Sequence, residues 1–365
     1  MRGGEAAADV AHACDEQRVF FHLRILTMSY QVTIQPSGHK FLVNEDETIL
    51  AAALREGFTL PYGCRNGACG SCKGKVLEGE VDHGKYQENT LKSHEIAEGR
   101  ALFCVAKPLS DLVIEAREIR AAGEVPVKTL PCRVQKLEKL ADDVMLMQLK
   151  LPANERLQFL AGQYIDFLLK DGKRRSYSIA NPPHADEFIE LHLRHVPGGR
   201  FTDHVFSAMK EKDILRFEGP HGSFFIREDS DKPMIFVAGG TGFAPIKGML
   251  EHLFAEESGR QMVLYWGARA KKDLYMAELP VRWQQERGNF SFIPVLSDPA
   301  PQDQWQGRTG YVHQAVLEDF DDLSGFEVYA CGAPVMVDAA REGFTRTRGL
   351  PEDAFFADSF VYQAD

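Results

Sequence analysis

Four cysteines set the strongest limit on how this chain can fold. Cys64, Cys69 and Cys72 follow one another in a C-x4-C-x2-C pattern within a glycine-rich loop, and Cys104 comes 32 residues after Cys72. Three sulfurs from so short a loop converge only if the backbone reverses twice, which the glycines of the loop permit. This spacing is typical of four thiolates that hold a cluster of two iron atoms and two sulfides. The chain is therefore expected to handle single electrons.

Other uses of four cysteines fit the pattern less well. Structural zinc sites usually take C-x2-C pairs on short knuckles rather than three cysteines and a distant fourth. A disulfide framework is typical of short secreted chains, whereas this chain has 365 residues and its apolar stretch at 19–26 does not resemble a signal peptide.

Cys14, Cys132 and Cys331 are predicted to be free thiols. Free thiols beside a thiolate-held cluster indicate a reducing compartment, and we expect the cytoplasm.

The length and charge of the chain limit its organisation and its partners. A chain of 365 residues is too long for one core, so several domains are expected. No apolar run is long enough to cross a bilayer, so we expect no membrane partner. The net charge of −11 argues against nucleic acid as a partner. Regular patterns begin near Tyr30, and residues 1–28 are predicted to be a disordered leader without function.

Residues 29–115 are predicted to form an α+β domain of the β-grasp type. The stretches at 30–35 and 40–43 alternate apolar and polar residues, as half-buried strands do, with a Pro-Ser-Gly-His turn between them. Residues 48–56 have helical spacing, and Gly57 lies just past their end. Strand, strand, helix and then a cysteine loop is the order of that fold. We therefore expect the cysteines near the surface, where a redox partner can approach.

Two further domains are predicted after a linker at residues 116–126, which shows no apolar periodicity. Residues 127–228 contain many short alternating runs with turns between them, which indicates an antiparallel β-barrel. Residues 116–228 carry 18 basic and 16 acidic side chains and are the only segment that is not acidic, which suits a phosphate-bearing cofactor. Residues 229–365 alternate short apolar strands with helical segments, so we expect a parallel α/β sheet.

The barrel segment carries two candidate binding motifs. Arg175, Tyr177 and Ser178 lie on one predicted strand and offer a cation, an aromatic wall and a hydrogen-bond donor, as a flavin dinucleotide requires. An ordinary amphipathic strand explains R-x-Y-S about as well. The Gly-Gly-Arg-Phe-Thr run at 198–202 precedes a predicted helix, whose N-terminus would present free N–H groups to a phosphate. A plain turn with a helix cap is the competing interpretation.

The last segment carries two more candidates at the ends of predicted strands. The run Ala-Gly-Gly-Thr-Gly-Phe-Ala-Pro at 238–245 places three glycines between a strand and a helix, where a dinucleotide pyrophosphate can approach the backbone. It departs from G-x-G-x-x-G because Pro245 takes the final glycine position. Cys331 follows another predicted strand, and we expect its thiol to face the crevice where a nicotinamide would lie. A buried small apolar side chain is the alternative interpretation of Cys331.

In this order, the four cysteines, R-x-Y-S, G-G-R-F-T, G-G-T-G-F-A-P and C-G-A-P resemble the ferredoxin–NAD(P)H reductase superfamily with a fused N-terminal plant-type ferredoxin. The resemblance covers residues 29–365. It implies a multidomain fold, with a β-grasp 2Fe–2S ferredoxin domain, an antiparallel β-barrel that binds FAD, and an α/β parallel-sheet domain that binds NAD(P)H. The chain is similar both to reductases of CDP-6-deoxy-Δ3,4-glucoseen in deoxysugar biosynthesis and to reductase components of aromatic and alkane oxygenases.

The resemblance also implies roles for individual residues. Cys64, Cys69, Cys72 and Cys104 would hold the 2Fe–2S cluster, and the closing segment 356–360 would place an aromatic or acidic side chain beside the flavin. Ser178 and Cys331 would lie beside the reacting rings. The residues implied in FAD binding are Arg175, Tyr177, Ser178, Gly199, Arg200, Phe201 and Thr202. Those implied in binding the nicotinamide nucleotide are Gly240, Thr241, Gly242 and Cys331.

The implied function is that of an NADH-dependent reductase. Electrons would pass from NADH through FAD and the 2Fe–2S cluster to an electron-accepting protein, either a dehydrase or an oxygenase component. The flavin is needed because a hydride carries two electrons and the cluster accepts one. NADPH is an alternative donor because Arg269, Lys271 and Lys272 could pair with a 2′-phosphate. A redox sensor or electron-storage module with an inactive reductase half is an alternative from another functional class.

Overall fold

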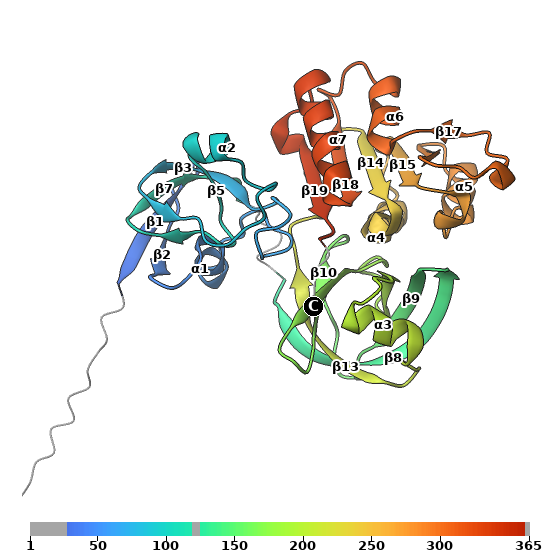
Figure 1. Ribbon diagram of the computed structural model, residues 1–365, viewed down its shortest axis with the longest axis horizontal. Helices are drawn as coiled ribbons and strands as arrows, with labels where there is room; N and C mark the ends of the chain where they lie inside the picture. The colour runs from blue at the N-terminus through green and yellow to red at the C-terminus, as the bar shows by residue number, and fades with distance from the viewer. Residues whose placement is uncertain (1–27, 119–124, 362–365) are drawn as a thin grey trace, which may run out of the picture.

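The computed structural model describes residues 28–118 and 125–361. Within these residues, three β-sheet domains follow one another along the chain (Figure 1). We call them the N-terminal domain (28–115), the barrel (128–221) and the C-terminal domain (234–359). Residues 1–27 of the predicted leader (1–28) and residues 119–124 of the predicted linker (116–126) lie outside the described residues.

The N-terminal domain has the β-grasp order predicted from the sequence. Its elements are β1 (Ser29–Gln35), β2 (Lys40–Asn44), α1 (Ile49–Arg55), β3 (Lys73–Glu78), β4 (Val81–Asp82), α2 (Ser93–Ala97), β5 (Arg100–Leu102), β6 (Lys107–Pro108) and β7 (Leu112–Glu115). The main sheet runs β2-β1-β7-β3-β5, with β1 parallel to β7 and the other neighbours antiparallel. Strands β4 and β6 form a separate antiparallel pair. The cysteine loop (56–72) connects α1 to β3 and is therefore held at both ends by packed elements.

Helix α1 begins where the sequence supplies a cap. The Thr48 side chain accepts a hydrogen bond from the Ala51 N–H at 3.2 Å, which satisfies one of the free donors of the first turn. The helix then buries Ile49 and Leu50 in the domain core. The predicted helix at 48–56 is one residue longer at each end, because Thr48 and Glu56 are its caps.

Replacing Thr48 with alanine is expected to lower the free energy of unfolding by about 1 kcal/mol, because the helix loses its side-chain cap. Thermal or urea unfolding of the purified protein measures this. Thr48→Ser keeps the hydroxyl acceptor and should retain most of the stability. Equal losses in both variants would mean that the methyl group, rather than the cap, is what matters.

The barrel is antiparallel, as predicted. Its elements are β8 (Lys128–Ala141), β9 (Val144–Lys150), β10 (Tyr164–Leu168), β11 (Arg174–Ser178), β12 (Ile189–Arg194), α3 (Arg200–Ser207) and β13 (Ile214–His221). The strand order is β11-β10-β13-β8-β9-β12, and every pair in it is antiparallel. A bridge between Ile179 and Leu191 joins the two edges and closes the barrel. Fully or nearly fully buried side chains such as Ile165 and Phe167 fill its interior.

The C-terminal domain is the predicted parallel α/β sheet. Its elements are β14 (Met234–Gly239), α4 (Phe243–Ala255), β15 (Met262–Ala268), α5 (Glu278–Glu286), β16 (Phe290–Leu296), β17 (Arg308–Thr309), α6 (Val312–Asp319), β18 (Glu327–Gly332), α7 (Pro334–Thr347) and β19 (Phe355–Ser359). All six strands are parallel, in the order β17-β16-β15-β14-β18-β19. The order reverses between β14 and β18, and ligands of such sheets bind at the carboxyl ends of the strands at that point.

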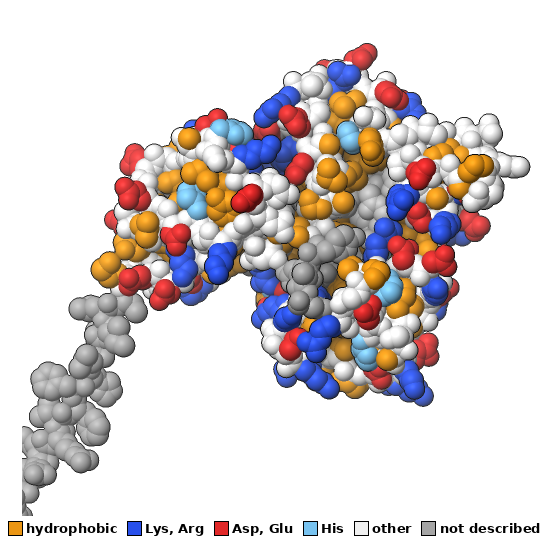
Figure 2. Space-filling view, in the orientation of Figure 1, with side chains coloured by type: hydrophobic (Ala, Val, Ile, Leu, Met, Phe, Trp, Pro, Cys, Tyr) orange, Lys and Arg blue, Asp and Glu red, His pale blue; other side chains and the backbone are white. Residues whose placement is uncertain are grey.

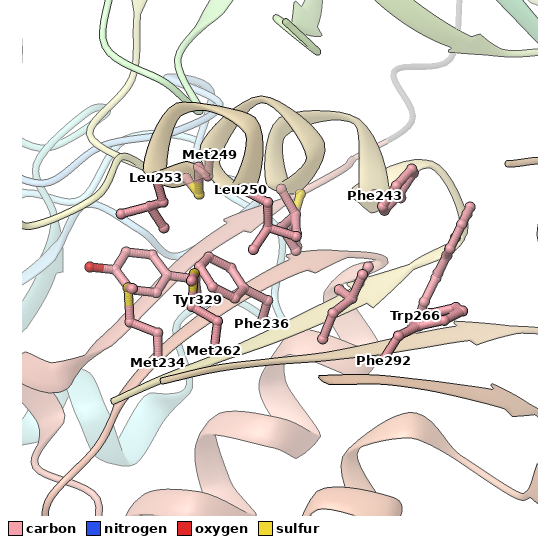
Figure 3. Close-up of a cluster of buried hydrophobic side chains, with 14 of the residues drawn as sticks. Met234, Phe236, Phe243, Met249, Leu250, Leu253, Met262, Trp266, Phe292 and Tyr329 are labelled. Carbon is pink, nitrogen blue, oxygen red and sulfur yellow. The ribbon is translucent and has the colours of Figure 1, made fainter. Parts of the chain in front are cut away.

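Helices cover both faces of this sheet. In Figure 3, Met249 and Leu250 of α4 lie over Phe236 and Tyr329 of the strands, and Phe243 at the start of α4 stacks on Trp266. Helices α6 and α7 pack on the opposite face. The continuous apolar composition of β14 and β18 follows from burial on two sides. No helix in the described ranges combines the length and apolar character needed to span a membrane.

Candidate functional site

The four motif cysteines come together at the end of the loop after α1. The Cys64 sulfur accepts a hydrogen bond from the Ala68 N–H at 3.4 Å, and the Cys69 sulfur accepts one from the Cys64 N–H at 3.3 Å. Amide donors aimed at sulfur are the outer shell that a thiolate-ligated cluster requires. The loop turns through left-handed backbone at Gly67 and Gly70, with φ of 75° and 77°. These features fit the 2Fe–2S cluster that the spacing predicts.

The sulfurs lie in two hydrogen-bonded pairs, Cys64 with Cys69 and Cys72 with Cys104. A hydrogen bond from Cys69 lowers the pKa of Cys64 to about 7, and a hydrogen bond from Cys72 lowers the pKa of Cys104. The same bonds, together with burial, raise the pKa of Cys69 and Cys72 well above the usual value. Cys69 also interacts electrostatically with Cys72 and Cys104. The four sulfurs therefore lie near one another, as the ligands of one cluster must.

A pocket opens where the three domains meet. Strand β11 and helix α3 form its barrel side, the cysteine loop forms a second side, and the start of α4 and the end of β19 close it. The cysteine loop thus borders the same pocket as the predicted flavin motif. The lining residues are Gly63, Cys64, Asn66, Tyr164, Arg174, Arg175, Ser176, Tyr177, Ser178, His192, Arg194, Val196, Gly199, Phe201, Thr202, Thr241, Ala244, Asp358, Ser359, Phe360 and Val361.

Most of the predicted binding residues line this pocket. Those that do are Arg175, Tyr177, Ser178, Gly199, Phe201, Thr202 and Thr241. Arg200 lies outside the lining and pairs with Asp171, with Nη1 and Oδ2 3.2 Å apart. Gly240 and Gly242 belong to the turn between β14 and α4, immediately beside Thr241. Cys331 is wholly buried in the C-terminal core and does not line the pocket.

An aromatic wall stands on the barrel side of the pocket. The ring of Tyr177 lies 5.7 Å from that of Phe201 and 5.9 Å from that of Phe167, measured between centroids. Phe167 and Phe201 are themselves 5.1 Å apart and buried in the barrel core. Tyr177 is therefore held from behind, and a flat ring can stack on such a wall. In Figure 2, Lys and Arg side chains gather over the barrel, which suits a dinucleotide with a pyrophosphate.

A buried carboxyl group lies at the back of the pocket. Asp358 of β19 hydrogen-bonds Ser178 of β11 and is only 8% exposed. Burial, followed by the charge of Cys69, raises the pKa of Asp358 to about 7. Asp358 also stands opposite Cys331 in the pairing of β18 with β19. Ser178, Asp358 and Cys331 are therefore neighbours, although their separation in sequence gives no sign of it.

The turn after β14 is built for a close backbone approach. A Cβ on Gly242 would lie 2.0 Å from the carbonyl oxygen of Cys331, so only glycine fits between β18 and α4. The carbonyl of Gly240 accepts a hydrogen bond from the Trp266 ring N–H at 2.9 Å, which anchors the turn. The turn leads directly into α4 at the strand-order reversal. This geometry fits the pyrophosphate of a nicotinamide dinucleotide.

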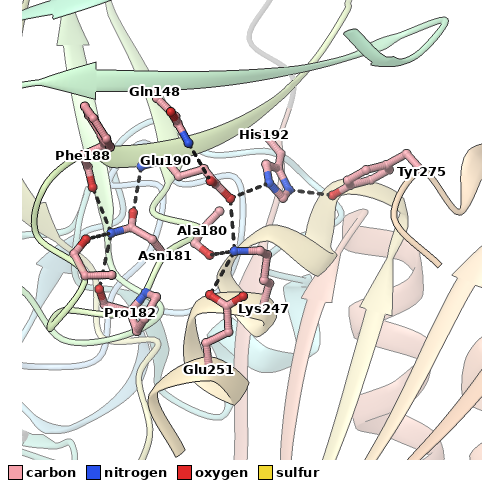
Figure 4. A network of polar contacts seen from close by, with 11 residues as sticks. Gln148, Ala180, Asn181, Pro182, Phe188, Glu190, His192, Lys247, Glu251 and Tyr275 are labelled. Carbon is pink, nitrogen blue, oxygen red and sulfur yellow. Dashed lines mark hydrogen bonds and ion pairs between the residues drawn. The ribbon is translucent and has the colours of Figure 1, made fainter. Parts of the chain in front are cut away.

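A buried polar network connects the barrel to α4 beside the pocket (Figure 4). Lys247 of α4 lies 3.1 Å from Glu190 and 3.0 Å from Glu251, and its ammonium also donates to the carbonyl of Ala180. Burial opposes ionisation of Glu190, but the bond from His192 and the charge of Lys247 lower its pKa to about 2. The network therefore holds paired charges, and it fixes the barrel against the first helix of the C-terminal domain.

Several lining residues carry no recognisable signal in the sequence. Tyr164, His192 and Arg194 sit on ordinary alternating strands, and nothing in their local pattern separates them from other strand residues. Asn66 is a partial exception because it lies inside the cysteine motif. Asp358 falls in the segment at 356–360, for which the resemblance implies an aromatic or acidic side chain beside the flavin.

Three family models match the chain in sequence. The 2Fe-2S iron-sulfur cluster binding domain matches residues 32–109. The oxidoreductase FAD-binding domain matches residues 131–226. The oxidoreductase NAD-binding domain matches residues 236–342. The cofactors predicted from the motifs are confirmed by these matches.

Relatives match over nearly the whole chain. The CDP-6-deoxy-L-threo-D-glycero-4-hexulose-3-dehydrase reductase of Yersinia pestis is 43% identical over 92% of this chain and 99% of its own. The phenol hydroxylase P5 protein of Acinetobacter pittii is 38% identical over 93% of this chain and 96% of its own. Among solved structures, an Amycolatopsis cytochrome P450 reductase aligns with a TM-score of 0.72 at 35% identity, covering 91% of this chain and 99% of that one.

Proposed function

The chain belongs to the ferredoxin–NAD(P)H reductase superfamily, in the branch with a fused N-terminal 2Fe–2S ferredoxin, and on that premise we propose that it reduces a CDP-hexulose 3-dehydrase. It is an NAD(P)H-dependent iron–sulfur flavoprotein reductase. When bound, the cofactors supply all of the redox chemistry, with hydride uptake at FAD and single-electron carriage at the cluster. The observation that carries the electron path is the pocket shared by the cysteine loop, the flavin motif and the start of α4.

The barrel residues of the pocket are proposed to hold FAD. Tyr177 would stack on the ring system, and Ser178 would hydrogen-bond near its reactive nitrogen. Arg175, with Arg200 and the N-terminus of α3, would face the pyrophosphate. Support comes from the aromatic wall behind Tyr177 and from the place of Arg175, Tyr177 and Ser178 in the pocket lining.

The C-terminal residues of the pocket are proposed to hold NADH. Gly240, Thr241 and Gly242 would carry its pyrophosphate, and Cys331 would act from behind the turn rather than by direct contact, since its thiol is wholly buried. In the loop after β15, Lys272 lies 3.6 Å from Asp142 of the barrel, and both side chains are exposed. Comparison of kcat/KM for NADH and NADPH tests the donor, and a preference for NADPH would contradict this assignment.

The dehydrase assignment follows from the identity of 43% to the Yersinia pestis reductase across 92% of the chain. Its test is a reconstitution of the cofactor-loaded protein with NADH, a CDP-6-deoxy-L-threo-D-glycero-4-hexulose-3-dehydrase and that enzyme's substrate. NADH consumption should rise well above that of the reductase alone. We place the reaction in the cytoplasm, because a thiolate-held cluster needs a reducing compartment.

An oxygenase is the second candidate acceptor, favoured by the identity of 38% to the phenol hydroxylase P5 protein over 93% of the chain. The same assay with a phenol hydroxylase oxygenase component separates the two. Stimulation by the oxygenase alone would replace the dehydrase assignment. A redox sensor would show no sustained NADH turnover with either protein.

Replacing Tyr177 with alanine is expected to weaken FAD binding by roughly 10- to 100-fold, because about 1.5–3 kcal/mol of ring burial is lost. The flavin content of the purified protein and a titration of the apoprotein with FAD measure this. Tyr311→Ala is the matched control, since Tyr311 is 63% exposed and outside the pocket. If the Tyr177 variant retains as much flavin as the control, the assigned wall is wrong.

A further inference from the structure

An ion pair with one buried partner joins the cysteine loop to the barrel. The guanidinium of Arg65, next to Cys64 in the loop, contacts the carboxylate of Asp166 on β10. Asp166 is only 2% exposed, whereas its neighbours Ile165 and Phe167 point into the barrel core. Because strand residues alternate, Asp166 points outward. Its carboxylate is therefore buried beneath the loop that carries Arg65.

Two further contacts link the same surfaces. The Tyr164 hydroxyl donates to the carbonyl of Gly63 at 2.7 Å. Tyr62 and Ser223 exchange bonds, since the Tyr62 N–H donates to the Ser223 hydroxyl at 2.9 Å and the Ser223 N–H donates to the Tyr62 carbonyl at 3.2 Å. All of these groups are nearly inaccessible to solvent. The loop is thus fixed to the barrel at residues 62, 63 and 65, immediately before and after the first cysteine.

Charge is balanced around the pair. Arg174 binds Glu218 through two contacts of 2.5 and 3.2 Å and lies 3.7 Å from Asp166. The hydroxyl of Ser176 donates to Asp166 at 2.6 Å. Asp166, Glu218 and His221 are close enough to suggest a cation site. Two guanidiniums already neutralise the two carboxylates, however, so an ion-pair joint explains the cluster better than a metal.

We propose that Arg65 and Asp166 are positioning residues that dock the cysteine loop on the barrel. By doing so they fix the distance between the pocket and the four cysteine sulfurs that would hold the cluster. The inference rests on the proposed electron path. Electron tunnelling falls off exponentially with distance, so a loop that leaves the barrel slows transfer without changing either cofactor site. Neither Arg65 nor Asp166 is among the residues that line the pocket, although Asp166 contacts two that do, Arg174 and Ser176.

Asp166→Asn in the cofactor-loaded protein tests the docking without altering the cysteine loop. Because Asp166 is buried but Arg65 is 29% exposed, loss of the carboxylate is expected to shift the docked–undocked equilibrium by roughly 10- to 100-fold. Hydrogen exchange should therefore accelerate by about that factor at the Tyr62 and Ser223 amides, which bond across the joint. In single-turnover mixing with NADH, flavin bleaching should keep its rate, and bleaching of the cluster band should slow at least tenfold.

Two further variants make the result decisive. Asp186→Asn breaks an exposed barrel ion pair with Arg156, 3.2 Å in length, and should leave exchange and both rates unchanged. In the double variant Arg65→Gln with Asp166→Asn, amide exchange should be no faster and cluster bleaching no slower than in Asp166→Asn alone, because the two residues act through one contact. Unchanged exchange at both amides in Asp166→Asn would overturn the proposal, and so would exchange in the double variant that is clearly faster than in Asp166→Asn. A parent protein in which NADH bleaches flavin but never the cluster would instead overturn the electron path, and the exchange result would still stand.

Discussion

In the Cys69→Ser variant, NADH-driven reduction of cytochrome c is expected to fall to background while NADH still bleaches the flavin absorbance. Serine cannot replace a thiolate as a soft ligand, so the cluster loses one of its four sulfur ligands from the protein. The flavin motif and the turn after β14 belong to other domains and keep their own cores. The two activities should therefore separate by a factor of at least about 100, which anaerobic stopped-flow and steady-state assays measure directly.

The matched control is Cys132→Ala, which removes a thiol that is 2% exposed in the barrel core and is not one of the four motif cysteines. It should keep both activities and its full iron and sulfide content. Equal loss of flavin and cytochrome c reduction in Cys69→Ser would show that the cluster supports the fold rather than accepting electrons after the flavin. Full retention of cytochrome c reduction would place the electron exit at the flavin.

The fold and the cofactor classes were predictable because their signals are local. The cysteine spacing, the strand alternation and the glycines between β14 and α4 each lie within a few residues of one another. All three domain types predicted from them are confirmed by the sheet topologies and by the family models. Local patterns also located seven of the pocket residues, since β11 and the start of α3 carry most of the barrel side.

What the sequence could not provide depends on contacts between domains. Arg65 and Asp166 are 101 positions apart, and neither a loop arginine nor a strand aspartate signals its partner. Asp358 approaches Ser178 only because β19 is added to the far edge of the C-terminal sheet. The expectation that the Cys331 thiol faces the crevice rested on its place at a strand end, and the structure buries that thiol behind the glycine turn. Such placements are set by tertiary packing, which local periodicity does not encode.

The Gly242→Ala variant is expected to lose nucleotide binding and stability together. Gly242 has φ of −58° and ψ of −12°, which alanine adopts without strain, so the backbone conformation itself is no obstacle. The added methyl group would stand 2.0 Å from the carbonyl oxygen of Cys331 and 2.5 Å from its carbon, and neither backbone atom can rotate away. Strand β18 and helix α4 must separate, at a cost of about 3 kcal/mol or more.

Scanning calorimetry should record a fall in Tm of roughly 5–10 °C, and the dissociation constant for NADH should rise because the turn that would face the pyrophosphate has moved. Gly288→Ala is the control, since no atom lies within 4 Å of the position its Cβ would take. FAD content should remain at the parent level in both variants, because the barrel is not disturbed. A Gly242→Ala protein that binds NADH as the parent does would mean that the nucleotide approaches the sheet elsewhere than at the end of β14.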